Sequence, residues 1–171
     1  RINAAGRIDD AKHSVNLLIA DDEAIALEKS QIINTKNTER KEHDSNITEQ
    51  ALAMIDGDPV LISRKTTVVY NADWHKGVIG IVASRLTEKY YRPTIVMTNS
   101  NGYAAGSARS VAGFDLYEAL CECSDLLIQF GGHKYAAGLT MKTENIPAFQ
   151  QRFEEVVAAS IPEELLVQAI N

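Results

Sequence analysis

The sequence predicts an α/β protein: an N-terminal helical segment with a long connecting helix, then a compact α/β domain with a mixed sheet flanked by helices. Two observations support this prediction. Residues 35–46 contain no apolar residue and also no Gly or Pro, which is typical of a solvent-exposed helix that bridges two domains. From Pro59 onward, β-branched segments alternate with amphipathic helical segments, which is the order of elements in an α/β domain.

The first ten residues are rich in small side chains, and we expect either a ragged terminus or a loop tip there. A helix should begin near Asp10, with Asp9 or Asp10 as its N-terminal cap. A second should begin near residues 21–23, whose acidic side chains favour a helix N-terminus. Residues 56–59, Asp-Gly-Asp-Pro, end the helical region. The predicted domains are therefore residues 1–57 and 58–171, although a disordered linker over 35–46 is an alternative.

The second domain should contain strands separated by helices and turns. Asp115 is expected to cap a helix, and Pro147 to open one. Asn99–Gly102 has the composition of a hairpin turn. The predicted strands cover residues 66–70, 94–97, 103–108 and 139–141, and the predicted helices follow residue 77, residue 115 and residue 147, with a last short helix after Pro162.

The composition limits the possible functions. A net charge of −6 and a pI of about 5.2 give no global basic field, so a polyanion would have to bind at a local patch. Cys121 and Cys123 suggest neither a disulfide nor a metal site, which fits a reducing compartment. We recognise no signal peptide and no apolar run near the ~18 residues of a membrane span. Because the chain starts at Arg1 without Met, we expect it to be part of a longer protein.

Three polar, glycine-bearing segments are candidates for a binding site. The segment at 73–77 offers the indole of Trp74 for stacking, the imidazole of His75 and an ammonium group at Lys76. The segment at 106–110 offers Ser107, Arg109 and Ser110. Hydroxyl groups beside a guanidinium are suited to one phosphate group. Each residue also has a structural alternative: Trp74 in the core, His75 as a cap, and Arg109 paired with an acidic neighbour.

The third segment, at 131–133, is Gly-Gly-His, and we expect a tight turn there. Backbone N–H groups of Gly131 and Gly132 could cradle an anion, and His133 could donate a hydrogen bond near neutral pH. A structural turn with a packed histidine is the alternative. From the chemistry alone, phosphate binding and a purely structural role both stay open.

Five strings in order, RINAAGRID, DWHKGVIGIVASRL, YRPTIV, GSARS and FGGHKYAAG, resemble the RecJ family of single-strand-specific exonucleases in the DHH phosphoesterase superfamily. The resemblance covers essentially the whole chain. It implies a catalytic DHH domain that holds two divalent metals, Mn²⁺ or Mg²⁺, a long helix, and a DHH-associated domain that binds substrate. The whole protein would then be a cytoplasmic enzyme that degrades single-stranded DNA from the 5′ end in recombination and repair.

The resemblance also implies roles for individual residues. Ser107 and Arg109 match the positions expected to hold the 5′-terminal phosphate, with Ser110 beside them. His133 and His75 are the catalytic candidates, since the glycine–histidine motif is expected to close over the scissile region. The remaining substrate-contact candidates are Gly131, Gly132, Trp74, Arg1 and Arg7.

This sequence departs from the family pattern in one respect: the Asp-His-His signature and the other metal-binding aspartates are absent. The resemblance therefore predicts that the chain binds no metal and is inactive alone, with an upstream DHH domain of the same protein and single-stranded DNA as its partners. The alternatives are a phosphodiesterase of oligoribonucleotides or cyclic dinucleotides from the same superfamily, and a non-catalytic nucleic-acid-binding module.

Overall fold

The structure, a computed structural model, describes residues 2–166 and forms two compact units. The first unit covers Arg1–Asn46 and the second covers Ile47–Asn171, so the division lies inside one long helix. The predicted domain boundary between residues 57 and 58 lies just beyond the end of that helix. That residues 58–171 form a separate domain stays a prediction.

The first unit contains three helical segments. Helix α1 spans Ile2–Ile8 and α2 spans Lys12–Leu18. The expectation of a ragged terminus or a loop tip at residues 1–10 is therefore wrong for α1, because alanines are strong helix formers and favour helix in this stretch. Asp10 Oδ1 accepts a hydrogen bond of 2.9 Å from the Lys12 N–H, but the N-cap residue of α2 is Ala11 and not the predicted Asp9 or Asp10.

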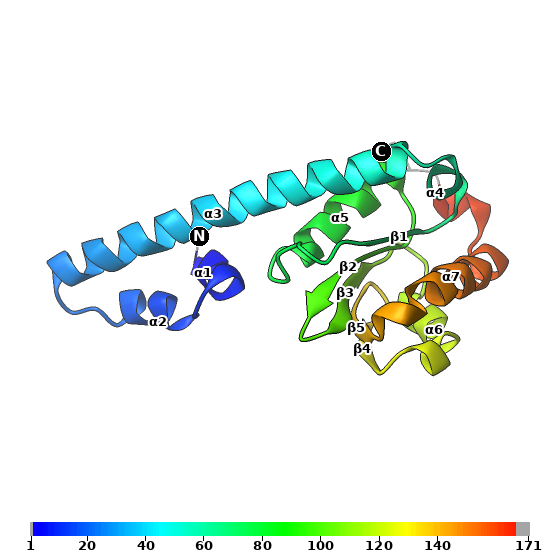
Figure 1. Ribbon diagram of the computed structural model, residues 1–171. Coiled ribbons are helices and arrows are strands. Elements are labelled where there is room, and N and C mark those ends of the chain that lie inside the picture. The colour runs from blue at the N-terminus through cyan, green and yellow to red at the C-terminus, as the bar shows by residue number, and fades with distance from the viewer. Residues whose placement is uncertain (1, 167–171) are drawn as a thin grey trace. The chain divides into compact units, whose positions relative to one another are not determined.

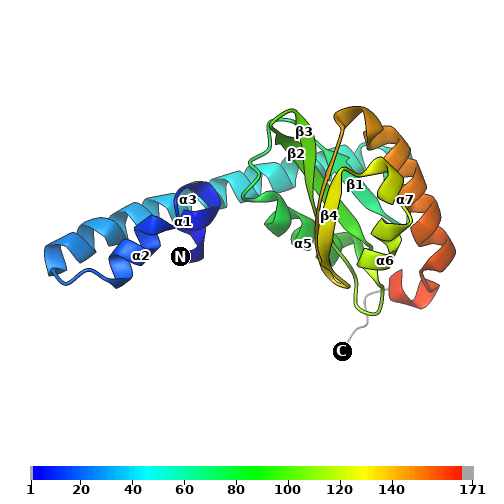
Figure 2. The same ribbon diagram turned by 90° about the horizontal axis from the view of Figure 1, so that it is seen from below.

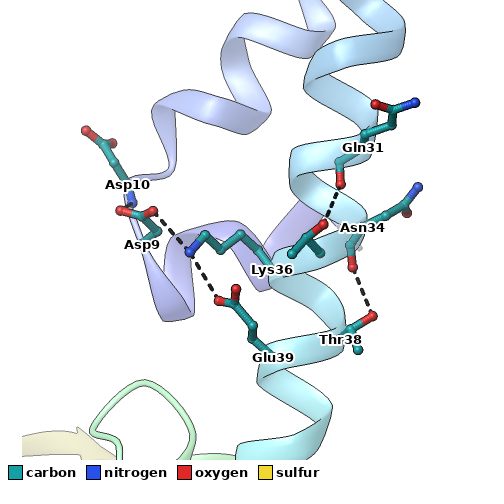
Figure 3. Close-up of polar contacts among 8 residues, drawn as sticks. Asp9, Asp10, Gln31, Asn34, Lys36, Thr38 and Glu39 are labelled. Carbon is teal, nitrogen blue, oxygen red and sulfur yellow. Dashed lines mark hydrogen bonds and ion pairs between the residues drawn. The ribbon is translucent and has the colours of Figure 1, made fainter.

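Helix α3 is continuous from Glu23 to Asp56, a length of 34 residues. Asp22 begins it, since its Oδ1 accepts hydrogen bonds from the Ala24 and Ile25 N–H groups at 2.8 and 3.1 Å. The polar stretch at 35–46 lies within this helix, which confirms the predicted helix over the alternative of a disordered linker. Figure 3 shows Lys36 of α3 between two carboxylates, Glu39 at 3.1 Å and Asp9 at 3.6 Å.

The second unit is built on a five-stranded sheet in the order β1-β2-β3-β5-β4 (Figures 1 and 2). β1 pairs with β2 in parallel and every other pair is antiparallel, so the sheet is mixed as predicted. The strands are β1 Thr67–Tyr70, β2 Thr94–Ser100, β3 Tyr103–Arg109, β4 Gln129–His133 and β5 Ala136–Met141.

Helices cover both faces of this sheet (Figure 1). Helix α5, Ile79–Tyr90, packs on β2 and β3 from one side. Helices α6, Leu116–Cys121, and α7, Ile146–Ser160, cover the other side, where Phe149 and Phe153 are buried against Ile95 and Met97 of β2. Asp115 caps α6 as predicted, accepting hydrogen bonds from two N–H groups of its first turn. Short 3-10 helices cover Ser124–Leu126, Thr143–Asn145 and Glu163–Leu166.

The Gly-Gly-His segment is a strand and not the turn expected from the sequence. Gly131, Gly132 and His133 belong to β4, and the chain reverses after them at residues 134–135. Glycine has a poor intrinsic preference for strands, but the ladder to β5 overrides it here. The hairpin between β2 and β3 agrees with the prediction: Asn101 and Gly102 have positive φ angles of 54° and 84°.

Arg92 fastens the short helix α4, Pro59–Ser63, to the sheet. Its side chain is buried, and its guanidinium donates to the carbonyl groups of Leu61, Ile62 and Arg64. Its Nε donates to Thr67 Oγ1 on β1 at 2.8 Å. Burial lowers the pKa of the guanidinium from its usual value. Because the last carbonyl groups of a helix have no partner within the helix, Arg92 supplies donors that α4 cannot provide for itself.

Candidate functional site

Strand register brings predicted site residues from different segments onto one face of the sheet. Ala104 and Ala108 of β3 belong to the core shared with α6 and α7, so the alternate residues Ser107 and Arg109 face the α5 side. Residues paired across antiparallel strands point to the same face. Two rows therefore cross β3, β5 and β4 on that side: Arg109, Ala136 and His133 in one row, and Ser107, Gly138 and Gly131 in the next.

A groove of about 390 Å³ follows the Ser107 row and the adjacent row of Ala105, Thr140 and Gln129, whereas the Arg109 row does not line it. Its floor lacks side chains at Gly138 and Gly131, and a Cβ atom added at Gly131 would meet no atom within 4 Å. Ser107 and Gly131 line it from two of the predicted segments, and Lys76 lines it from the third. The complete lining is Lys76, Ile79, Ala105, Gly106, Ser107, Gln129, Phe130, Gly131, Gly138, Leu139 and Thr140.

The first turn of α5 lies directly against Ser107 and Arg109. A Cβ atom at Gly80 would lie 3.0 Å from Arg109 Nη2 and 3.2 Å from Ser107 Oγ, so the absence of a side chain at residue 80 allows this approach. Arg109 is half-buried, and its Nη1 donates to the Ala108 carbonyl at 2.8 Å. Helix α5 has no side-chain cap at its N-terminus, where Val78 is the capping residue.

The turn before α5 is held in place by Trp74. This residue is only 4% exposed, and its Nε1 donates to Gln50 Oε1 on α3 at 2.8 Å. Its carbonyl accepts a 2.6 Å hydrogen bond from Thr98 Oγ1. The expected stacking of a base on this indole is therefore not available in this structure, because the ring faces the interior. His75 is half-buried, and its Nδ1 accepts from the Gly77 N–H at 3.1 Å, so Lys76 is the residue that this turn contributes to the groove.

The remaining predicted residues lie outside the groove lining. Gly132 points to the opposite face, and a Cβ there would lie 2.3 Å from the Ala136 carbonyl oxygen, so this glycine is required by the fold. His133 is exposed, and its Nδ1 accepts from the Tyr135 N–H at 3.2 Å. Ser110 Oγ donates to the Phe114 carbonyl at 3.0 Å.

Two predicted residues belong to the N-terminal end of the chain. Arg7 is exposed in the last turn of α1, which is part of the first compact unit. Arg1 lies outside the described residues. The groove as described is therefore formed entirely by residues of the second unit.

The other reactive groups of the described residues do not add a second site. Within residues 2–166, no group of three or more His, Cys, Asp or Glu side chains is arranged to hold a metal ion, so we derive no metal-dependent step from these residues. Cys121 and Cys123 are free thiols, and burial raises the pKa of Cys123 to about 11, which disfavours the thiolate. Over the same part of the chain, no helix is both long and apolar enough to cross a bilayer.

Sequence reasoning missed several residues of the groove. Gln129, Gly138 and Thr140 all line it, and Gly80 borders Ser107 and Arg109. The signal that could have found these three is a two-residue spacing, between Gly138 and Thr140 in one segment and between Gln129 and Gly131 in the other. Such a spacing identifies one face of a strand once each segment is assigned as a strand. Gly80 had no comparable signal, because its role depends on the packing of α5 on β3.

The fold and the groove define an α/β domain with an open face that carries a hydroxyl and a guanidinium beside the start of a helix. The family model described as "DHHA1 domain" matches residues 57–159. The chain belongs to the DHHA1 domain family.

Relatives in which this region occurs are named "Single-stranded-DNA-specific exonuclease RecJ". The chain is 42% identical to the protein from Bacillus subtilis over 96% of its own length, and 35% identical to that from Escherichia coli over 97%. It spans only 21% and 30% of those relatives. Its fold is similar to that of RecJ from Thermus thermophilus, crystallised in complex with Mn²⁺, with a TM-score of 0.83 and 36% identity. That match covers 94% of this chain and 23% of the crystallised one.

Proposed function

We propose that this chain is the substrate-binding part of a RecJ-like exonuclease, and that it holds the 5′-terminal phosphate of single-stranded DNA at Ser107 and Arg109. The observation that carries the proposal is the position of these two side chains. They occupy adjacent rows on the α5 side of the sheet, next to the start of α5, and Ser107 also lines an open groove. The relatives that share this region are named for their action on single-stranded DNA.

The side chains of Ser107 and Arg109, together with the start of α5, are suited to binding a phosphate monoester. A guanidinium presents a planar fork that can bond two phosphate oxygens, and a serine hydroxyl donates a further bond. The first N–H groups of a helix have no acceptor within the helix. In α5, which spans 12 residues, the side chain of the N-cap residue supplies no acceptor for these N–H groups. Together these groups provide donors and positive potential without a large net charge on the chain.

His133 has the position of a residue that contacts the terminal nucleotide from the edge of the sheet. It lies at the far end of the Arg109 row, on the edge strand β4, and its side chain is exposed. We assign it to the scissile region of the bound strand. His75 and Ser110 instead bond to the backbone of their own turns, and we assign them to shaping those turns.

A catalytic domain supplied by the rest of the protein would complete the enzyme. The first unit exposes apolar side chains that, in a folded protein, mark a contact surface. We propose that an upstream DHH domain covers them and that this domain carries the Mn²⁺ or Mg²⁺ ions. The exposed side chains are Val15, Leu18, Ile19, Ile25 and Leu27.

The chain alone should then bind strands without cutting them. A gel assay on 5′-labelled single strands with Mn²⁺ tests this point. Metal-dependent cleavage that co-purifies with the chain through several columns would contradict it.

The experiment that tests the phosphate site uses Arg109. We expect Arg109→Ala to weaken binding of a 5′-phosphorylated oligothymidylate by about 1.5–3 kcal/mol, which corresponds to a loss of about ten- to more than hundredfold. Arg109→Lys should be nearly as weak, because lysine keeps the charge but loses the planar fork. Fluorescence anisotropy with 5′-phosphorylated and 5′-hydroxyl strands measures both effects.

The matched control is Arg152→Ala, because Arg152 is an exposed arginine of α7 that pairs with Asp125 on the opposite side of the sheet. Thermal melts separate binding from folding: if Arg109 only supports the fold, both Arg109 variants melt earlier than the wild type. If the preference for the 5′-phosphate persists undiminished in Arg109→Ala, Arg109 is not the phosphate anchor.

A further inference from the structure

Lys76 places a second positive group at the other end of the groove. Its Nζ donates to Ser100 Oγ at 3.0 Å. Ser100 is the last residue of β2 and pairs with Tyr103, the first residue of β3. The ammonium group therefore lies beside the β2–β3 hairpin, and it lines the same groove as Ser107.

The two ends of the groove are too far apart for one phosphate group. Tyr103 and Ser107 are four residues apart on one strand, which corresponds to about 13 Å. A nucleoside monophosphate has only one phosphate, so it can use one end only. A strand of DNA carries a phosphate at every nucleotide and can reach both.

The residues between the two ends are suited to the uncharged parts of a nucleotide chain. Gly138 and Gly131 leave the floor open beside Ser107. The next row toward the hairpin is Ala105, Thr140 and Gln129. The hydroxyl group of Thr140 and the amide group of Gln129 can hydrogen-bond to sugar or base. Among the residues that line the groove, Lys76 is the only charged one, so the middle of the groove is neutral.

We infer that the groove binds a run of several nucleotides, with the 5′ end at Ser107 and Arg109 and the strand running along the sheet toward Lys76 at the β2–β3 hairpin. This inference rests on the proposed function, which places the terminal phosphate, and adds the direction of the strand and a binding residue at its other end. Lys76 contacts an internal phosphate, and Gln129 and Thr140 lie under the nucleotides between.

A structural role for Lys76 gives a different expectation. Its hydrogen bond to Ser100 could simply fasten the turn at 73–77 to the hairpin. Lys76 and Ser100 form an exposed pair, and Trp74 already anchors the same turn through one buried and one partly buried hydrogen bond. Replacing Lys76 by Met should therefore leave the melting temperature nearly unchanged, whereas a structural role would lower it.

The test compares two probes on the chain: thymidine 5′-monophosphate and a short 5′-phosphorylated oligothymidylate. We expect Lys76→Met to weaken binding of the oligothymidylate several-fold and to reduce the slope of log K against log salt by about 0.7, the value for one phosphate contact to a single strand. Binding of the monophosphate should not change. Lys76→Arg should restore the slope, because it restores the charge.

Lys89→Met is the matched control. Lys89 lies in the last turn of α5, at the end of the helix opposite to the groove, and pairs with Asp56 at 3.4 Å. If Lys76→Met weakens both probes equally, or leaves the oligothymidylate unaffected, the inferred path of the strand is wrong.

Arg109→Ala separates this outcome from a failure of the proposed function. If Arg109→Ala weakens both probes while Lys76→Met weakens neither, only the path of the strand fails. If Arg109→Ala weakens neither probe, the phosphate site itself is misplaced, and the inference falls with it.

Discussion

The two adjacent glycines of β4 should respond in opposite ways to the same substitution. In Gly132→Ala, the new Cβ would lie 2.3 Å from the Ala136 carbonyl oxygen and 2.5 Å from the Ala137 Cα, both backbone atoms of the paired strand. Gly132 also has a φ of 152°, which side chains rarely tolerate. Strain in the backbone and overpacking each cost about 1–3 kcal/mol, so the expected loss of stability is about 2–6 kcal/mol.

Gly131→Ala should be tolerated by the fold. A Cβ at that position meets no atom within 4 Å, and the glycine has no positive φ. Alanine in a strand is more favourable than glycine by about 0.5–1 kcal/mol, so stability should stay level or rise slightly. The methyl group would project into the floor of the groove, and we expect weaker binding of a 5′-phosphorylated oligothymidylate.

Thermal melts and fluorescence anisotropy on the two variants separate these effects. Gly132→Ala should lower the melting temperature by about 4–24 °C, and Gly131→Ala should lower affinity without lowering the melting temperature. The reasoning is refuted if Gly132→Ala has the same melting temperature as the wild type, or if both variants lose the same amount of stability. Either result would mean that the register of β4 on β5 is not the one described.

Three further predictions concern contacts that hold the second unit together. Arg92→Met removes four hydrogen bonds of a buried guanidinium and should cost about 3 kcal/mol or more in urea unfolding; a smaller loss than for an exposed arginine would contradict its role. The Tyr90 hydroxyl is the main cause of the lowered pKa of Asp56, so stability from this carboxylate is present above its unfolded pKa and is lost as the pH falls below about 4. In Tyr90→Phe, NMR titration should show that the pKa of Asp56 rises toward its usual value, and an unchanged pKa would exclude the hydrogen bond as its cause. Gln50→Leu leaves the buried indole N–H of Trp74 without its acceptor and should cost about 1–3 kcal/mol in thermal unfolding, whereas an unchanged melt would show that water replaces the glutamine.

Local signals in the sequence were sufficient for much of the fold. Helix α3 follows from good helix formers without Gly or Pro, and Asp115 marks the start of α6 by its capping side chain. The β2–β3 hairpin follows from Asn101 and Gly102, which tolerate positive φ angles. In each case, residues close together in the chain determine the structure, so a single sequence contains the information.

The strand β4 shows where local signals fail. Gly131 and Gly132 favour a turn when only their neighbours are considered. Their partners Gly138 and Ala137 lie several residues further on, and the pairing makes the segment a strand. Without that pairing, Gly131 cannot be assigned to the groove and Gly132 to the opposite face.

The candidate site was predictable in its residue types but not in its geometry. Ser107 and Arg109 form a recognisable phosphate-binding pair in the sequence, yet their position next to Gly80 depends on how α5 packs on the sheet. For Trp74, the predicted role itself was wrong. An indole in a polar turn suggested stacking, but Gln50, from the end of α3, accepts its N–H and the ring is buried.

The bonds of Arg92 also set an order of events during folding. Helix α4 has five residues, which is too short to be stable in water by itself. Its last carbonyl groups receive their donors from a side chain up to 31 residues further along the chain, at the end of α5. Since these bonds can form only after β1, α5 and β2 have come together, we expect α4 to be absent from the folding nucleus and its amide protons to gain protection from exchange late. In the native protein, release of one guanidinium should expose the amides of the whole helix at once.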